Sequence, residues 1–202
     1  MEQEHVWDEL YSARLSWKKE SITLPHMLKN KHVLELGVGT GKTLVSILRQ
    51  KPKQIYAVDF SEKAIEKSVE RFGNNVTFVK ADAKHLPFEN ESFDIVVCYY
   101  VLNNSLKKDR ELVANEIRRV LKKGGVCLFE DFSVNDLRNE GPRHKTDKNT
   151  RVKKSGLICH FFEERELKEL FSDFKIKLDK ESFYPIKNVK AMREIIKIVA
   201  RK

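Results

Sequence analysis

Short apolar runs alternate with segments of helical periodicity along most of the 202 residues. This alternation is typical of βαβ units, in which a helix connects two parallel strands. The longest apolar run, 93–100, should be a central strand, because a strand covered on both faces is apolar throughout. Further strands are expected at 33–36, 54–58, 76–79, 126–130, 174–183 and 194–199. The sequence therefore predicts a doubly wound α/β domain with a mainly parallel sheet.

Helices are expected between these strands. Residues 42–50 form an amphipathic segment, and Ser61 is suited to cap a second helix. A third helix, from about 108 to 122, should end at the basic, glycine-containing stretch that follows it. A short helix should occupy 163–171.

Composition favours a single domain with a basic surface. An apolar share of 41% is ordinary for a globular protein, so residues 1–202 should share one core. The net charge is +9; residues 138–154 hold seven Lys or Arg against two acids, and 175–202 hold nine against three. This surplus indicates either a solvated surface or a surface for RNA or another polyanion. Residues 133–156 show no period, and a loop of that length is usually functional or mobile.

Cysteine usage and the amino terminus indicate an intracellular protein. Cys98, Cys127 and Cys159 are far apart and show no metal-binding or redox spacing, so we expect reduced thiols and no metal. Residues 1–10 are acidic and lack the apolar segment of a secretory signal. No run approaches the ~20 apolar residues of a membrane-spanning helix. We therefore expect a cytoplasmic protein without a membrane partner.

A glycine-rich turn follows the first expected strand, in the stretch 33–45, VLELGVGTGKTLV. A phosphate-binding loop needs Gly-x4-Gly-Lys-Ser/Thr, but Leu36 stands where its first glycine belongs. A dinucleotide-binding fingerprint, Gly-x-Gly-x-x-Gly, would need glycine or alanine at the position of Lys42. Both kinds of nucleotide loop are therefore disfavoured.

The pattern that fits is Glu-x-Gly-x-Gly-x-Gly, formed by Glu35, Gly37, Gly39 and Gly41. It resembles the first motif of the class I S-adenosylmethionine-dependent methyltransferases. Glycines in such a turn let a ligand approach the backbone closely. The resemblance implies that the methionine part of S-adenosylmethionine lies there.

Two acids follow at suitable distances. Asp59 ends the second expected strand, 22 residues after Gly37, where Rossmann-like proteins place an acid on the ribose hydroxyls. Asp82 follows the third strand, where the resemblance implies contact with the adenine amino group. Residues 86–104 and 116–132 resemble the fourth and fifth strand motifs of the family. The resemblance thus implies S-adenosylmethionine as cofactor, bound by Glu35, Gly37, Gly39, Gly41, Asp59, Phe60, Asp82, Ala83 and Tyr99.

The same resemblance implies more about the fold. It implies a Rossmann-like sheet of seven strands, mostly parallel, with an antiparallel last strand. Residues 1–30 should form a helical lid over the cofactor. Residues 133–160 should form a basic loop on the substrate side.

Methyl transfer from a sulfonium mainly requires that donor and nucleophile be held in line at attack distance. A general base is needed only if the nucleophile must lose a proton, so the catalytic residues stay open. Candidates at the carboxyl ends of strands are Asn103 and Asp131, and His160 follows the basic loop. Tyr100 and Asn104 are candidate substrate contacts; the alternatives are core packing for Tyr100 and strand termination for Asn104.

A closer resemblance is to the tRNA 3-methylcytidine methyltransferases. It is carried by WDELY near the amino terminus, by EDFSVNDLRNE at 130–140 and by NTRVKKSGLICHFFEERELKELF at 149–171. The resemblance favours RNA, with tRNA as one choice, slightly over a small molecule as the methyl acceptor. Arg138, Arg151 and Lys153 would then contact phosphate; with a small acceptor the basic loop would instead be a lid. A cofactor-binding scaffold without catalytic activity is the alternative from another class.

Overall fold

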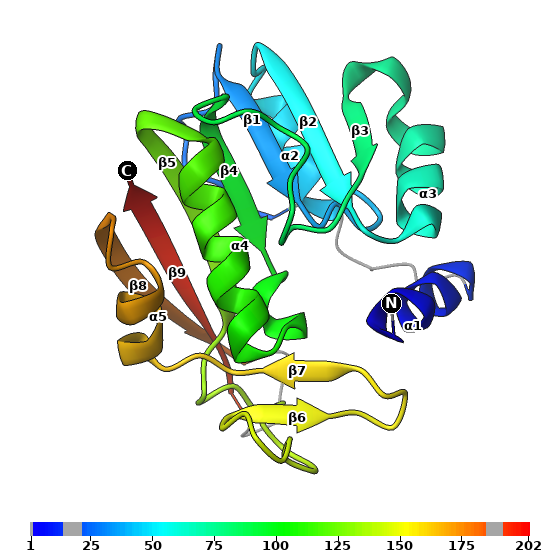
Figure 1. Cartoon of the computed structure of the whole chain (residues 1–202), viewed down its shortest axis with the longest axis vertical. Helices are drawn as coiled ribbons and strands as arrows, with labels where there is room; N and C mark the ends of the chain where they lie inside the picture. Colours follow the sequence, from blue (N-terminus) through cyan, green and yellow to red (C-terminus); the bar gives the residue numbers. More distant parts are fainter. Residues whose placement is uncertain (1, 14–21, 185–191) are drawn as a thin grey trace.

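The computed structural model describes residues 2–13, 22–184 and 192–202. Its order of elements is that of a βαβ protein with an added helix at the amino terminus and an antiparallel pair of strands at the carboxyl terminus (Figure 1). The strands are β1 (His32–Leu36), β2 (Gln54–Asp59), β3 (Thr77–Lys80), β4 (Phe93–Tyr99), β5 (Leu121–Phe132), β6 (Thr150–Val152), β7 (Ile158–His160), β8 (Lys175–Phe183) and β9 (Arg193–Arg201). The helices are α1 (Glu2–Ser12), α2 (Lys42–Arg49), α3 (Glu62–Phe72), α4 (Lys107–Val120) and α5 (Glu164–Leu170), with short 3-10 turns η1 (Gly73–Asn75) and η2 (Leu102–Asn104).

Seven strands form one sheet in the order β3-β2-β1-β4-β5-β9-β8. The pairs among β1 to β5 are parallel, whereas β9 is antiparallel to both β5 and β8. The predicted Rossmann-like, mostly parallel sheet with an antiparallel last strand is confirmed. The order reverses at β1, whose neighbours are β2 and β4, and a crevice at the carboxyl ends of the strands is the usual ligand position in such sheets.

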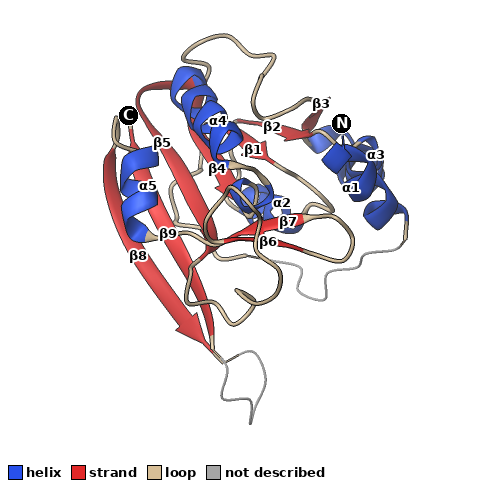
Figure 2. Ribbon diagram, turned by 60° about the horizontal axis from the view of Figure 1, so that its bottom comes forward, coloured by secondary structure: helices blue, strands red, loops and turns tan. Residues whose placement is uncertain are grey.

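Two apolar layers cover the sheet. Because side chains alternate between the faces of a strand, Leu34 and Leu36 of β1 pack with α4 and α5, while Val33 packs with α2 on the other face. In Figure 2 the helices lie on both sides of the sheet. Ser61 caps α3 as predicted, its hydroxyl accepting a 3.1 Å hydrogen bond from the Ala64 N–H.

The end of α4 differs from the prediction. The helix stops at Val120, and residues 122–125 lie inside β5, where they form an irregularity between two pairings with β4, Phe93 with Leu121 and Ile95 with Val126. Gly124 has a φ of +74°, which a side chain rarely adopts. The basic glycine run therefore bends a strand instead of ending a helix.

The prediction of a loop at 133–156 is wrong in one part, because a small antiparallel hairpin, β6 with β7, begins inside this segment. Its strands are three residues long, too short to show a period in the sequence. The expected helical lid at 1–30 is helical at α1, but the described residues 22–30 form no helix. Residues 14–21 of that lid lie outside the described residues.

Within residues 2–13, 22–184 and 192–202, no helix is both long and apolar enough to cross a membrane. The same residues contain no group of three or more His, Cys, Asp or Glu side chains placed to hold a metal ion.

Candidate active site

The glycine turn leaves β1 at the point where the strand order reverses. Gly37, Gly39 and Gly41 all have positive φ values, of 68°, 52° and 76°. A Cβ atom on Gly37 would lie 2.6 Å from Cγ2 of Val101, and one on Gly39 would lie 2.8 Å from the hydroxyl oxygen of Tyr11. Both positions therefore require glycine for conformational and steric reasons.

Asp59 holds this turn from the neighbouring strand. Its carboxylate accepts hydrogen bonds from the N–H groups of Gly39, at 2.9 Å, and Ser61, at 3.0 Å. Burial raises the pKa of Asp59 to about 6, although these backbone donors oppose the rise. A carboxylate accepts about four hydrogen bonds, so Asp59 retains capacity for the hydroxyls of a ligand.

Glu35 is a buried carboxyl beneath the turn, with 2% of its surface exposed. Its Oε2 atom has no hydrogen-bond partner among the described residues. Burial, and then the nearby charge of Asp59, raise the pKa of Glu35 well above its usual range. An unpaired buried polar atom is costly, and a ligand amine or hydroxyl would provide the missing partner.

The sequence-predicted adenine side lies at the ends of β2 and β3. Asp82 is exposed and accepts a 2.9 Å hydrogen bond from the N–H of Lys84. Phe60 and Ala83 are half-buried, and Tyr99 is buried at the end of β4. Residues at the ends of β1, β2, β3 and β4 thus converge on one edge of the sheet, as predicted from the sequence.

Helix α1 packs over the glycine turn. Ser61 donates a 2.5 Å hydrogen bond to the carboxylate of Asp8, and Lys67 donates one to the backbone oxygen of Tyr11. Trp7 stacks on Tyr11 with ring centroids 5.5 Å apart. The Tyr11 hydroxyl thus lies against Gly39, at the glycine turn.

Asn103 of η2, the turn that follows β4, lies next to Asp131 of β5. Asp131 is fully buried, and its carboxyl accepts hydrogen bonds from the N–H groups of Asn103, at 3.0 Å, and Phe132, at 2.9 Å. Burial raises the pKa of Asp131 well above its usual range. The side-chain oxygen of Asn103 is buried without a partner among the described residues. Asp131 therefore positions η2, and Asn103 retains an unpaired amide oxygen.

Tyr100 and Asn104 flank this pair. Tyr100 has a φ of +59° and donates a 2.5 Å hydrogen bond to Glu130, whose pKa burial raises. Its ring lies 5.0 Å from that of Phe132, and Asn104 donates to its backbone oxygen at 3.2 Å. Glu130 was not predicted from the sequence, because nothing local marks a strand glutamate as the partner of a tyrosine that follows the neighbouring strand.

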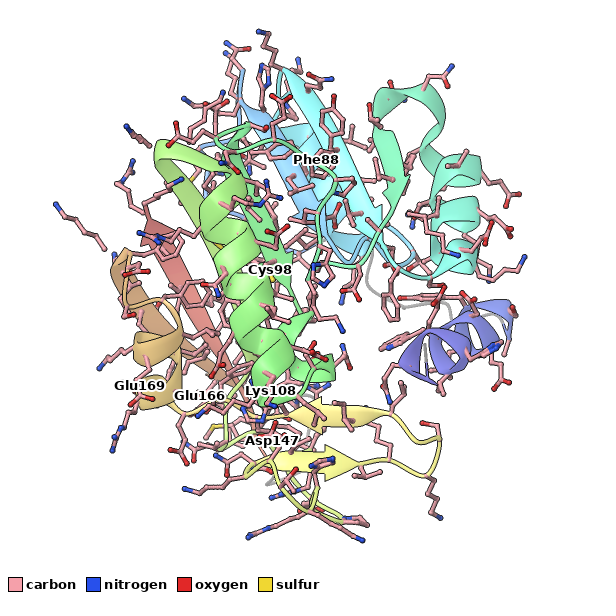
Figure 3. The ribbon with its side chains drawn as sticks, viewed as in Figure 1. Phe88, Cys98, Lys108, Asp147, Glu166 and Glu169 are labelled. Atoms are coloured by element: carbon pink, nitrogen blue, oxygen red, sulfur yellow. The ribbon has the colours of Figure 1, made fainter. Side chains whose placement is uncertain are left out.

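His160 lies in a buried polar network instead of facing an open site. Its Nδ1 lies 2.7 Å from the hydroxyl of Thr150, and its Nε2 lies 2.8 Å from Glu166. Arg110 of α4 completes the network, with ion pairs of 3.0 Å to Asp147 and 2.9 Å to Glu166. Figure 3 shows Glu166 beside the lower end of α4 and Asp147 below it. Both ring nitrogens of His160 are engaged, so it holds the β6–β7 hairpin against α4 and α5.

The three basic candidates differ in exposure. The Arg138 side chain is 39% exposed and lies on the ring of Phe132, with its guanidinium carbon 3.6 Å from the centroid. Lys153 is exposed, on the turn of the hairpin. Arg151 is 9% exposed, and its Nε and Nη1 have no partner among the described residues. Arg151 thus lies inside the substrate-side segment, where an outer phosphate contact is not available to it.

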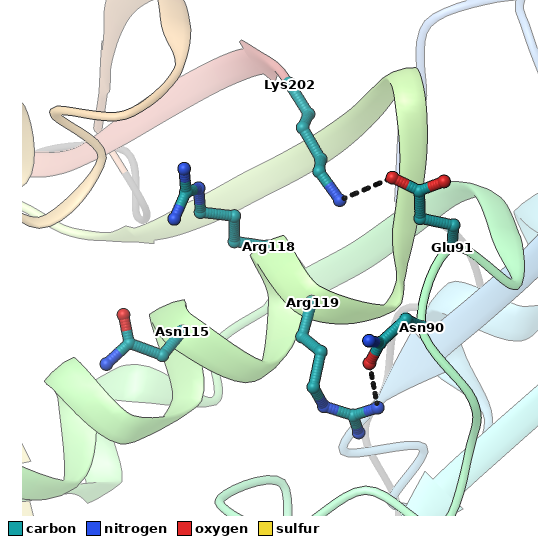
Figure 4. A pocket seen from close by; sticks show the side chains of 6 residues that line it. All are labelled: Asn90, Glu91, Asn115, Arg118, Arg119 and Lys202. Atoms are coloured by element: carbon teal, nitrogen blue, oxygen red, sulfur yellow. Dashed lines mark hydrogen bonds and ion pairs between the residues drawn. The ribbon is translucent and has the colours of Figure 1, made fainter.

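A hollow of about 700 Å³ lies at the opposite edge of the sheet, beside the end of α4 (Figure 4). Its basic side chains have partners: Lys202 pairs with Glu91 at 3.7 Å, Arg119 donates to Asn90 at 3.1 Å, and Arg118 pairs with Asp173 at 3.3 Å. It lies away from the glycine turn and contains none of the predicted site residues.

Comparison with known proteins agrees with this geometry. Residues 34–129 match the family model described as a methyltransferase domain. The chain is 31% identical over 160 residues to tRNA N(3)-methylcytidine methyltransferase Mettl2 of Drosophila melanogaster, covering 72% of the chain and 49% of the relative. It is 32% identical over 121 residues to demethylmenaquinone methyltransferase of Lactiplantibacillus plantarum, covering 55% and 50%. The chain thus spans about half the length of these relatives.

Two solved structures share the fold. An S-adenosylmethionine-dependent methyltransferase of Methanosarcina mazei has a TM-score of 0.72 at 20% identity, over 89% of this chain and 98% of the other. A Burkholderia thailandensis 1,6-didemethyltoxoflavin-N1-methyltransferase, with bound 1,6-didemethyltoxoflavin and S-adenosylhomocysteine, has a TM-score of 0.71 at 21% identity, over 100% and 89%.

Proposed function

The chain belongs to the class I S-adenosylmethionine-dependent methyltransferase family, and on that premise we propose that it binds S-adenosylmethionine and transfers its methyl group to an RNA. The observation that carries the proposal is the glycine turn braced by Asp59 above the unpaired carboxyl of Glu35. A fold relative that had lost its ligand would have no reason to keep this costly arrangement.

The cofactor contacts follow from the position of each residue. The turn of Gly37, Gly39 and Gly41 receives the methionine part, and Glu35 lies beneath it. Asp59 receives the ribose hydroxyls with its remaining lone pairs. Asp82 and its neighbour Ala83 receive the adenine, together with Phe60 at the end of β2 and Tyr99 at the end of β4.

When bound, S-adenosylmethionine supplies a methyl group activated by the positive sulfonium, so the chain mainly orients the acceptor. Asp131 fixes η2 through the N–H of Asn103, and Asn103 offers its unpaired amide oxygen to the acceptor. Tyr100 is held by Glu130 with its ring toward Phe132.

The acceptor is RNA, with tRNA as the first choice, because the relative with the longer match acts on tRNA and the substrate-side segment is basic. A small-molecule acceptor is the second candidate, supported by the quinone-pathway relative. The three cysteines are free and buried, which suits the reducing cytoplasm.

Calorimetry tests the cofactor assignment. Asp59→Ala should abolish S-adenosylmethionine binding, because it removes both the brace of the turn and the ribose contact. Asp179→Ala, which removes an exposed acid from β8, is the matched control and should bind as the wild type does. Wild-type affinity in Asp59→Ala would refute the assignment.

Labelled cofactor tests the acceptor. The protein is incubated with methyl-labelled S-adenosylmethionine and, separately, with total tRNA, a protein extract and a pool of small metabolites. Label in tRNA supports the proposal. Label only in the metabolite pool identifies the second candidate, and no label in any pool, together with intact cofactor binding, identifies a scaffold.

A further inference from the structure

Two arginines share one buried carboxylate just beyond the end of β5. Nε of Arg138 donates to Oδ1 of Asp136 at 2.9 Å, and Nε of Arg193 donates to Oδ2 at 2.7 Å. Burial alone would raise the pKa of Asp136, but these two guanidinium groups hold it below its usual range. Among the described residues, neither arginine donates a hydrogen bond from its terminal nitrogens. Each therefore presents a fixed fork of donors.

Both guanidinium groups also lie on aromatic rings. The carbon of the Arg138 guanidinium is 3.6 Å from the Phe132 centroid, and that of Arg193 is 5.6 Å from Phe132 and 5.8 Å from Phe183. Phe132 is in turn 5.0 Å from Tyr100. A continuous series of rings and guanidinium groups thus runs from the end of β4, at the proposed site, to the end of β8.

The outer end of this series is exposed. Phe183 is 38% exposed and Tyr184 is 66% exposed, and the side chain of Arg138 is 39% exposed. Packing accounts for the inner members, but it does not account for the open side chains of Phe183, 5.8 Å from Arg193, and of Tyr184, which follows it in the chain. Exposed rings that alternate with guanidinium groups suit unpaired bases, since every base has a face that stacks.

We propose that Arg138, Phe183, Tyr184 and Arg193, the stacking surface, bind unpaired nucleotides of the RNA acceptor next to the site of methyl transfer. This inference rests on the RNA acceptor of the proposed function. The bases stack on Phe183, Tyr184 and the outer plane of Arg138. The free donor forks of Arg138 and Arg193 bind the phosphates, and Asp136 fixes both forks.

A binding experiment can distinguish recognition of bases by the stacking surface from attraction between charges alone. Fluorescence anisotropy compares a single-stranded oligouridine with an abasic ribose-phosphate strand of equal length and charge, and with duplex RNA. The oligouridine should bind at least about fivefold more tightly than the abasic strand, since one stacked base contributes about 1–3 kcal/mol. The duplex should bind no better than the abasic strand, because its bases are stacked on one another.

The variant Phe183→Ala/Tyr184→Ala should bring the affinity for oligouridine down to that for the abasic strand, whose affinity stays unchanged. Arg138→Lys should weaken oligouridine binding more than abasic-strand binding, because it keeps the charge, loses the donor fork that binds phosphate and also loses the plane on which a base stacks. Leu112→Ala, which truncates an exposed apolar residue of α4, is the control and should change neither affinity.

Equal affinity of the wild-type protein for the two strands would overturn the inference, because it would mean that charge alone binds RNA. Unchanged oligouridine binding by the double aromatic variant would overturn it as well. Failure to bind any RNA would overturn both this inference and the RNA acceptor. Calorimetry with S-adenosylmethionine then shows separately whether the methyltransferase assignment still stands.

Discussion

The carboxylate of Asp59 accepts a 2.9 Å hydrogen bond from the backbone N–H of Gly39, across 20 residues of chain. The bond ties the end of β2 to the turn after β1. The proposed cofactor contact of Asp59 and the shape of the glycine turn therefore depend on the same carboxylate.

Gly39→Ala should lose cofactor binding. A Cβ atom there meets the Tyr11 hydroxyl at 2.8 Å, and the positive φ of 52° is strained for alanine. Gly73→Ala is a matched control, because Gly73 has a φ of +55° and nothing within 4 Å of an added Cβ. Both variants should lose at least about 1 kcal/mol of unfolding free energy from the backbone strain, with the larger loss at Gly73, whose ψ is −139°, but only Gly39→Ala should weaken S-adenosylmethionine binding in calorimetry. Equal affinities in the two variants would contradict the close approach at Gly39.

Cofactor affinity should fall as the pH drops through about 6, because burial raises the pKa of Asp59 to about 6 and a protonated Asp59 loses acceptor capacity. The loss should approach tenfold for each pH unit below that value, as expected for one required ionised group. Calorimetry across this range measures it. A flat profile would mean that Asp59 does not contact the ligand as a carboxylate.

Protonation of Asp59 should weaken cofactor binding but stabilise the folded protein. Because the pKa of Asp59 is raised from 3.8 to about 6 on folding, the folded state binds more protons between these two values. The contribution of Asp59 to the free energy of unfolding therefore favours folding below about pH 4, and it is lost as the pH rises to about 6. Asp59→Asn should flatten this part of the pH dependence in urea unfolding, with Asp179→Asn as the control. An unchanged slope in Asp59→Asn would contradict the assignment.

Asp147→Ala should destabilise the protein by about 3 kcal/mol, because it leaves the Arg110 guanidinium buried with one fewer partner. The Arg110 and Asp147 side chains are 3% and 8% exposed. Urea unfolding measures the loss. Lys148→Ala breaks the neighbouring exposed ion pair with Glu163 and should cost less than about 1 kcal/mol. Similar losses in both variants would show that the buried network does not hold the hairpin.

Arg151→Met should raise the free energy of unfolding by about 1 kcal/mol, because Nε and Nη1 of this buried guanidinium lack partners and its one hydrogen bond, from Nη2 to the Asn139 backbone oxygen, is long at 3.4 Å. Arg165→Met, at an exposed position of α5, is the control and should change stability by less than about 0.5 kcal/mol. A large loss of stability in Arg151→Met would show that Arg151 is paired in solution.

Local signals in the sequence predicted much of this protein. The apolar run at 93–100 became β4, and the glycine pattern with Asp59 became one hydrogen-bonded unit. Burial makes the residues of β4 apolar, and the backbone conformation of the turn requires its glycines, so each feature can be recognised in a short stretch of sequence. Spacing alone was sufficient to predict that these stretches meet, because parallel strands bring their carboxyl ends to one edge.

Long-range pairing could not be predicted in the same way. Arg110 looks like an ordinary exposed helix residue in the sequence, yet it binds Asp147 across 37 residues. His160 seemed a candidate for catalysis because it follows a basic loop, but its partner Glu166 is fixed only when α5 packs. Such roles depend on the three-dimensional neighbours, which no periodicity encodes.

The two faces of the β6–β7 hairpin have different surroundings. Thr150 and His160 are paired across the strands and face the network of Arg110 and Glu166, while the alternating pair Arg151 and Cys159 faces away from it. Arg151 and Cys159 are buried as well, so the second face holds the hairpin by packing and lacks the ion pairs of the first.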